Sequence, residues 1–288
     1  MASAIRNAVL NIFLRAIQGF HGAIESAMEV LSGLGISFDA FTSGIHTVLR
    51  PFAFTIIGIC LLLELIQMTQ KAEMIKLEHG VKVATKIVLA VVFIDFLPML
   101  MQAIYAQAAA WIGGIGGMAG VGFSIETQES LEDLIGNVSG LGASLALLAS
   151  SLIVALAIWI AGIMIQIVAI ARVFEIYILV AISPLPAAFF PLSGSGDGSG
   201  YSRITLKFIR MFAAVCLQGV MMILCLHIFA LVMTTMIDNA ANAVIASGGG
   251  NATADVMALA LVMVMGSIVL VMAVTKAGTW AKSIMDAS

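Results

Sequence analysis

Residues 145–171 read L-A-L-L-A-S-S-L-I-V-A-L-A-I-W-I-A-G-I-M-I-Q-I-V-A-I-A, without one charged side chain. An α-helix rises about 1.5 Å per residue, so about 20 apolar residues cross the hydrocarbon core of a bilayer. This run exceeds that length and predicts a membrane-spanning helix. Four other stretches meet the same test: 51–69, 87–108, 208–236 and 256–275. The sequence therefore predicts an all-α, polytopic membrane protein with about five transmembrane helices.

The composition of the whole chain supports this fold class. Of its 288 residues, 61% are hydrophobic and 10% are charged, and the mean hydropathy is +1.12. A soluble domain carries about 25% charged residues to cover its surface. These values exclude a soluble enzyme, a nucleic-acid-binding domain with a basic face and a disordered chain. The net charge of −3 is too small to identify a partner.

The sequence contains no catalytic or metal-binding motif. Its four histidines are scattered, and no nucleophile elbow, phosphate-binding loop or zinc-type spacing occurs. The three cysteines lie in apolar stretches and read as small buried residues. They are Cys60, Cys216 and Cys225. We therefore expect no enzymatic activity, no cofactor and no bound metal.

Residues 4–31 have a different pattern, in which apolar residues recur at helical spacing along one side. The other side carries two sets of residues spaced by seven: Asn11, Gln18 and Glu25, and Arg15, Gly22 and Glu29. This pattern predicts an amphipathic helix with a polar stripe, suited to the membrane interface or to a contact between subunits. Asn11, Gln18 and Glu25 are the candidate contact residues. Whether the helix lies on, in or across the membrane is left open.

The distribution of lysine and arginine predicts the orientation in the membrane, because cytoplasmic loops carry an excess of both. Two regions contain neither residue, 109–144 and 237–255, so we expect them to be external loops. Ten of the 13 basic residues fall on the opposite side: Lys71, Lys76, Lys82, Lys86, Arg172, Arg203, Lys207, Arg210, Lys276 and Lys282. The N-terminus is then external and the C-terminus cytoplasmic, although Arg6, Arg15 and Arg50 would also be external. Residues 1–50 form an external arm, and residues 51–288 form the transmembrane domain.

The apolar segment 173–191 is interrupted by Pro184, Pro186 and Pro191. A full crossing would place the following basic residues on the external side, against the charge distribution. We therefore predict a re-entrant hairpin that enters and leaves on the cytoplasmic side, with the prolines breaking the helix at its turn. Non-helical backbone at this depth requires shelter from lipid, so the segment should face protein or a lumen.

The candidate ionisable residues inside the predicted spans are Asp95, Glu64 and His227. Such residues mark substrate or proton pathways, so all three are candidates for the wall of a lumen. The alternative is structural: Asp95 bonds to a neighbouring helix, Glu64 reaches the cytoplasmic interface, and His227 makes a bond between helices. Arg172 and Glu175 are three residues apart and can pair across one turn, which would anchor the entrance of the hairpin.

Glycines concentrate after residue 112. The pairs Gly113/Gly117 and Gly116/Gly120 have the spacing that lets two helix backbones approach closely. Interior glycines also weaken a helix. The region is therefore predicted to be an oligomer contact, with a flexible hinge or a close-packed corner as the alternatives.

Two runs of residues carry a resemblance to a known protein family. Residues 171–190 read A-R-V-F-E-I-Y-I-L-V-A-I-S-P-L-P-A-A-F-F, and residues 203–219 read R-I-T-L-K-F-I-R-M-F-A-A-V-C-L-Q-G. With the glycine- and serine-rich loop between them, they resemble the central region of TrbL-like proteins, polytopic subunits of type IV secretion and conjugative DNA-transfer machines. The residues that match the family pattern are Pro184, Pro186 and Phe189; Arg203, Lys207 and Arg210; and Gln218.

The resemblance implies a non-enzymatic subunit in the bacterial inner membrane, where copies would form a cyclic homo-oligomer, with a pentamer plausible. Implied partners are the secretion ATPases, bitopic membrane subunits, lipids, and single-stranded DNA attached to its relaxase. The hairpin and the basic residues after it would lie at the cytoplasmic mouth of a translocation channel or assembly platform. Two alternatives stay open: a stand-alone ion or small-solute transporter that uses Asp95 and Glu64, and a membrane anchor that conducts nothing.

Overall fold

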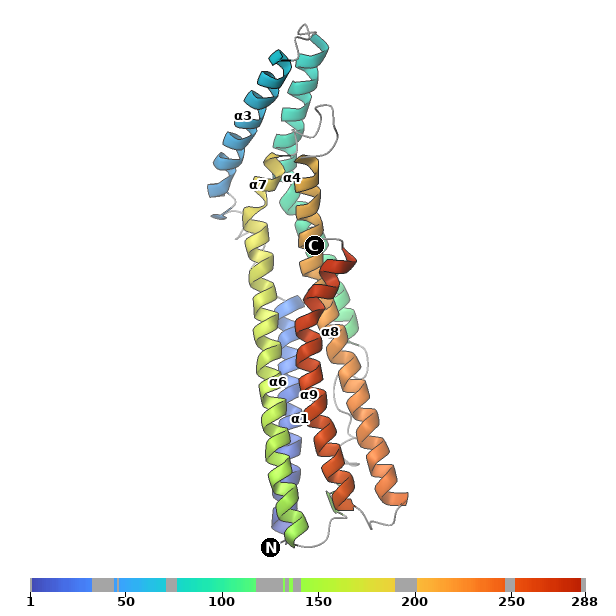
Figure 1. The fold of residues 1–288 in the computed structure, drawn as a ribbon. Helices are drawn as coiled ribbons and strands as arrows, with labels where there is room; N and C mark the ends of the chain where they lie inside the picture. Colours follow the sequence, from blue (N-terminus) through green and yellow to red (C-terminus); the bar gives the residue numbers. More distant parts are fainter. Residues whose placement is uncertain are drawn as a thin grey trace. The chain divides into compact units, whose positions relative to one another are not determined.

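The computed structural model describes residues 2–32, 44–45, 47–70, 77–117, 132, 135–136, 141–189, 201–246 and 252–285. Every regular element in these ranges is a helix (Figure 1), which confirms the all-α prediction. The helices are α1 (Ala2–Ser32), α3 (Thr47–Gln70), α4 (Leu77–Gly116), α6 (Leu141–Ile182), α7 (Pro184–Ala188), α8 (Tyr201–Ala246) and α9 (Ala252–Ile284).

Four helices in the described part of the chain are long and apolar enough to cross a membrane. They contain the stretches Ile87–Gly116, Leu141–Ala188, Ile204–Asn239 and Val256–Ile284. The remaining predicted span, 51–69, lies on α3. The apolar part of this helix, Thr47–Leu63, is shorter than the other four stretches. The chain is therefore a polytopic membrane protein, as its sequence predicts.

The helices extend beyond the predicted spans, because a hydropathy window marks the hydrocarbon layer rather than the end of a helix. Residues 109–116, predicted as loop, continue α4, and residues 237–246 continue α8. A larger correction concerns the 173–191 segment. Residues 173–182 continue α6 without a break, because nothing before the prolines interrupts the helix. The chain first turns at Ser183, and Pro191 lies outside the described residues.

The chain forms two compact units, and α4, α6, α8 and α9 contribute residues to both. The first unit contains Met1–Gly33, Ala110–Ala171 and Gly219–Gly278. The second contains Leu34–Ala109, Arg172–Gln218 and Thr279–Ser288. These units reflect packing, whereas the predicted division at residue 50 reflects membrane topology, so the two divisions do not coincide.

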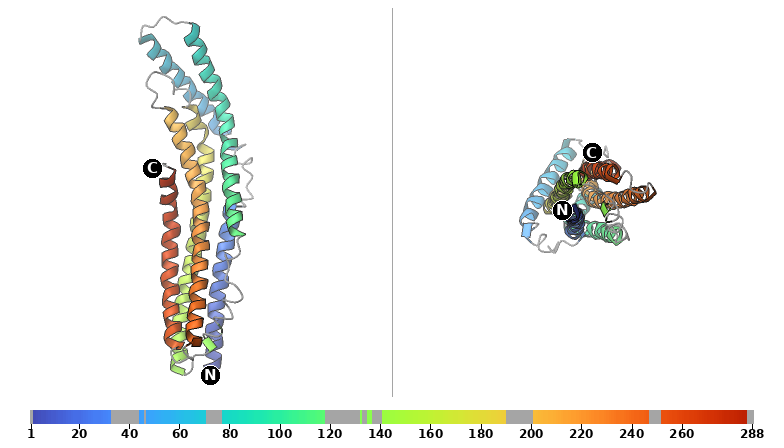
Figure 2. Two further views of the ribbon diagram at one scale, coloured as in Figure 1. Left: turned by 90° about the vertical axis from the view of Figure 1, so that its right-hand side faces the viewer. Right: turned by 90° about the horizontal axis from the view of Figure 1, so that it is seen from below.

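In the first unit, α1 lies along α6, α8 and α9 (Figures 1 and 2). Its apolar stripe is buried against these helices, and Val9, Phe13 and Ile17 are at most 4% exposed. They belong to one cluster with residues from the other three helices: Leu147, Val154, Met233, Ile237, Val256, Leu259, Ala260 and Met263. The apolar side of α1 is therefore covered by the chain's own helices and is not free to enter a membrane surface.

Small residues let α1 approach its neighbours. A Cβ on Gly162 of α6 would lie 3.3 Å from the Cβ of Ala23, which is tighter than ordinary van der Waals contact. Five residues further along α1, the side chain of Met28 fills the space beside Gly116 of α4. Small residues therefore let the C-terminal part of α1 pack closely in the first unit.

In the second unit, α3 and α4 form a helical hairpin, and the short helix α7 packs against α3. The first part of α8 belongs to the same unit, where Phe212 is fully buried. A hydrogen bond ties α8 to the turn before it: the hydroxyl of Thr205 donates to the carbonyl of Pro186 over 2.7 Å. The same carbonyl also accepts from the amide of Phe189, so one acceptor of the turn holds both the end of α7 and the start of α8.

Candidate functional site

An ion pair joins the two helices of the α3–α4 hairpin. A guanidinium nitrogen of Arg50, in the first turn of α3, lies 2.8 Å from a carboxylate oxygen of Asp95, in the middle of α4. The two side chains are 43% and 50% exposed. Of the two interpretations offered for Asp95, the structure shows the bond to a neighbouring helix. The pair also brings Arg50 level with Asp95 along the hairpin, although the sequence suggested different depths for the two residues.

The surroundings of this pair are apolar. The guanidinium of Arg50 lies 5.6 Å from the ring centre of Phe54, within the range of a cation–π interaction. Beside Asp95, Val92, Phe96 and Met99 are all exposed. A half-exposed ion pair on an apolar surface is costly if lipid covers it. We therefore consider the Arg50–Asp95 pair the best-defined candidate site in the second unit.

The two other ionisable candidates are Glu64 and His227. Glu64 lies on α3, and its side chain is outside what the structure describes. His227 lies on α8 in the first unit, where it is partly buried. Its Nδ1 atom is buried and has no hydrogen-bond partner within the described ranges. Of the three candidates, Asp95 is the one with an ion-pair partner among the described residues.

Arg172 and Glu175 form the predicted ion pair across one turn of α6, with side chains 18% and 43% exposed. The pair lies inside a continuous helix rather than at the entrance of a hairpin. Because both partners belong to the same turn, the pair neutralises two charges within an otherwise apolar helix.

The break in the helix lies at Ser183, where the chain turns into α7. Ser183 is fully buried, and its hydroxyl has no hydrogen-bond partner among the described residues. Pro184 begins α7, a position that suits proline because the first residues of a helix have no amide partner. The amide of Phe189 donates to the carbonyl of Pro186 and closes the short helix. The prolines therefore act at the turn, as predicted, but ten residues after the predicted start of the hairpin.

The basic residues after the turn lie along the first part of α8. The side chains of Lys207 and Arg210 are exposed, while that of Arg203 lies outside the described set. Gln218, one of the residues that carry the family resemblance, is 1% exposed and lies at the end of the second unit's share of α8. The exposed cations and the buried amide thus occupy successive parts of one helix.

The predicted small-residue contacts divide into two kinds. A Cβ on Gly113 would meet nothing within 4 Å, so no other helix of the described chain packs closely there. Gly116 contacts Met28 of α1, as noted above, and its predicted partner Gly120 lies outside the described residues. Gly117 ends the helix in a turn, with its amide bonded to the carbonyl of Gly113 over 2.9 Å.

The predicted contact residues of α1 are exposed. Asn11, Gln18 and Glu25 lie on the side of α1 opposite its buried stripe. Arg6 is bonded within the unit, because its guanidinium donates to the carbonyl of Gly136 over 2.7 Å. The polar side of α1 is therefore the part of this helix that is available to a partner or to water.

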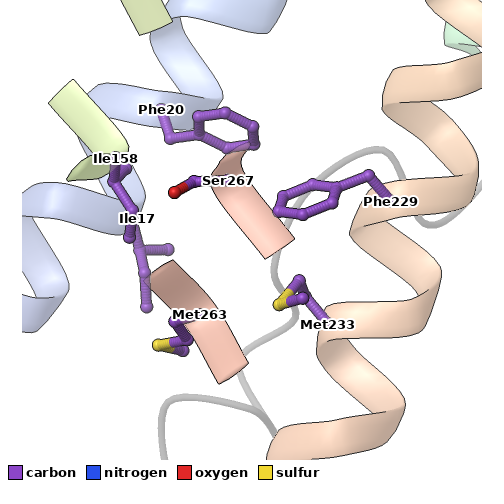
Figure 3. Close-up of a pocket in the computed structure, with 7 residues that line it drawn as sticks. All are labelled: Ile17, Phe20, Ile158, Phe229, Met233, Met263 and Ser267. Atoms are coloured by element: carbon purple, nitrogen blue, oxygen red, sulfur yellow. The ribbon is translucent and has the colours of Figure 1, made fainter. Parts of the chain in front are cut away.

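Sequence reasoning missed a small cavity inside the first unit (Figure 3). Its volume is about 20 Å³, which is enough for one water molecule. The hydroxyl of Ser267 is the polar group beside it, but this hydroxyl already donates to the carbonyl of Val264 over 2.8 Å. The lining residues come from four helices: Ile17, Phe20, Ile158, Phe229, Met233, Met263 and Ser267. An apolar cavity of this size is a packing feature and does not suit a polar ligand.

The described helices define a polytopic membrane protein in which Arg50 pairs with Asp95 and Arg172 pairs with Glu175. Among the described residues, no group of three histidine, cysteine or acidic side chains could hold a metal ion.

The family model for TrbL/VirB6 plasmid conjugal transfer-like proteins matches residues 37–184, and the chain belongs to this family. The match includes α3, α4 and α6 and ends at Pro184. Of the two runs that carry the resemblance, it therefore covers most of the first, and the second lies beyond it. Searches of curated proteins and of solved structures found no match.

Proposed function

We propose that this chain is a non-enzymatic subunit of a type IV secretion or conjugation machine in the bacterial inner membrane. It forms part of the translocation channel, or of the platform on which the channel assembles, for DNA–protein substrates. The family match over residues 37–184 is the observation that carries this proposal. The apolar helices support it, because they provide a multi-pass membrane body.

Copies of the chain assemble into a cyclic oligomer, for which a pentamer is the working number. The support is physical. The Arg50–Asp95 pair is half exposed among apolar side chains, and it needs protein or water rather than lipid on its open side. The secretion ATPases and bitopic subunits of the same machine are the other proposed partners. We propose further that the N-terminus is external and the C-terminus cytoplasmic, following the lysine and arginine distribution.

In this arrangement, the turn from Ser183 to Phe189 and the basic start of α8 form the cytoplasmic mouth. Lys207 and Arg210 are exposed there and would attract the phosphate backbone of a single DNA strand. The same charges also orient the protein in the membrane, so orientation is sufficient to account for them. We therefore propose orientation as the first role of these charges and DNA binding as a second, separate role.

The test is a mating assay with donor cells that lack this chain. Restoring the wild-type chain should restore DNA transfer, and transfer at wild-type frequency without the chain would contradict the proposal. Asp95→Asn then separates the two roles when assembly is followed by co-purification with other subunits. Lost transfer with assembly intact supports a channel wall, whereas lost assembly supports a platform. The matched control is Val92→Ala, because Val92 is an exposed apolar residue on the same face of α4.

A further inference from the structure

The exposed side of α1 carries a continuous polar stripe, spaced by three or four residues throughout. Its members are Asn7, Asn11, Arg15, Gln18, Gly22, Glu25 and Glu29, and all of them are exposed. From the first to the last, the stripe extends over about 33 Å at the usual helical rise. It is therefore about as long as the hydrocarbon core of a bilayer is thick.

The position of α1 beside α9 determines the depth at which this stripe lies in the membrane. On its buried side, Val9 and Phe13 share a cluster with Val256 and Leu259 of α9, and Phe20 and Ser267 line the same cavity (Figure 3). The two helices therefore lie side by side along the apolar stretch of α9 that is long enough to cross a membrane. The stripe consequently runs at the depth of a membrane span.

The neighbouring surfaces at this depth are apolar. On α9, Leu261 and Met265 are 66% and 60% exposed, and on α6, Leu156 is 57% exposed. These residues suit contact with lipid, whereas Arg15 and Glu25 do not, because charged side chains inside a bilayer face protein or water. The stripe of α1 must therefore face away from lipid.

The surface between α1 and α6 supports contact with water. A hollow of about 250 Å³ opens beside the stripe, and its wall is mostly apolar, with Arg15 of α1 and Gln166 of α6 as its polar side chains. A hollow of this volume has room for several water molecules, and these two side chains are polar partners for them. One polar side chain of α6, Gln166, thus lies beside the stripe of α1.

Direct contact between the stripes of two copies is disfavoured by symmetry. Around a cyclic axis, identical residues from different copies lie at the same level. Glu25 of one copy would then meet Glu25 of others, and the same holds for Arg15. Like charges in close contact repel, whereas rings of charge around a wet lumen are a known feature of channels.

From these observations we propose that α1 crosses the membrane beside α9, and that its polar stripe lines a water-filled passage between copies of the chain. Together with the four stretches that are long enough to span, α1 then makes five crossings. In this proposal α1 replaces the predicted span 51–69 as a crossing, so the N-terminus stays external and the C-terminus cytoplasmic. This inference rests on the oligomer in the proposed function. It differs from the sequence prediction, in which Asn11, Gln18 and Glu25 make direct contacts between subunits. The passage admits hydrated, polar solutes, with Arg15 near the middle of the stripe and the two glutamates toward one end.

The test is the reaction of single cysteines with a charged, membrane-impermeant thiol reagent. The full chain is used, in membranes of donor cells that carry the complete transfer machine. Native Cys60, Cys216 and Cys225 are first replaced by alanine, and DNA transfer by this background is measured. Gly22→Cys is the main probe, because a Cβ at Gly22 meets nothing within 4 Å, and Gln18→Cys is the second. Leu261→Cys on the lipid-facing side of α9 is the control.

We expect both stripe cysteines to react at least tenfold faster than Leu261→Cys. A smaller difference at both positions overturns the inference. Rapid disulfide formation between copies through Gly22→Cys, without reagent labelling, also overturns it, because that result means direct contact. The proposed function is judged separately by DNA transfer in the same cells: normal transfer with unreactive stripe cysteines refutes the passage alone.

Discussion

Replacing Gly162 with valine should loosen the contact between α1 and α6. The space beside Gly162 is occupied by the Cβ of Ala23, which would lie 3.3 Å from even the first added atom. A Cβ cannot rotate away, so accommodation requires the backbone of α1 to move. Overpacking of this kind costs about 1–3 kcal/mol. For a protein of this size, 1 kcal/mol corresponds to about 2–4 °C in melting temperature, so the expected loss is about 2–12 °C.

The native cysteines provide the assay. Cys216 is 4% exposed, so a thiol-reactive fluorophore reports its exposure as the purified protein is heated. Gly142→Val on the same helix is the matched control, because a Cβ there meets nothing within 4 Å. A glycine inside a helix costs about 1 kcal/mol relative to alanine, so the Ala23→Gly protein is the reference for the double variant. In the Ala23→Gly background, Gly162→Val should cost about 1 kcal/mol less than in the wild-type chain, as expected for two residues in contact. Equal melting temperatures for the two valine variants, or no coupling with Ala23, would refute the packing of α1 described above.

Three further variants test individual contacts by the same melting assay. Thr205→Val removes a 2.7 Å hydrogen bond and should cost about 1 kcal/mol; an unchanged melting temperature would argue against the bond. Phe212→Ala should cost about 3–5 kcal/mol because the ring is fully buried, whereas Phe174→Ala, at a ring 63% exposed, should change stability by less than about 0.5 kcal/mol. Asp95→Arg places two cations together and should lower stability by about 1 kcal/mol. Adding Arg50→Asp should restore most of that loss, and failure to do so would contradict the ion pair.

The helical class and the places of the spans could be predicted from the sequence, because a run such as 145–171 has no alternative environment to lipid and helix. The residues at which the helices end could not be predicted in this way. The α6 helix passes through Arg172 and Glu175 because the two charges neutralise each other within one turn. The distribution of lysine and arginine instead predicts the cytoplasmic end of a membrane span at Arg172.

The candidate site was only partly accessible to sequence reasoning. Asp95 could be selected because it is a carboxylate in an apolar run, but its partner Arg50 is 45 residues away. The charge distribution assigned Arg50 to the external end of a span, which hid the pairing. For α1, the amphipathic pattern is shared by helices that lie on a membrane and helices that pack in a bundle. Its burial against α6, α8 and α9 depends on distant residues that no local pattern reveals.

The Arg50–Asp95 pair has a consequence for biogenesis. A lone aspartate near the centre of a helix, as Asp95 is in α4, opposes the partition of that helix from the translocon by about 2.5–3.5 kcal/mol. This cost is lower when α3 and α4 insert together, because the charges of Arg50 and Asp95 are then paired. We therefore expect the ribosome to complete Asp95 before α3 leaves the translocon, so that the hairpin enters the lipid as one unit. The moment at which α3 enters the membrane, and not only the final packing, would then depend on a bond between residues 45 positions apart.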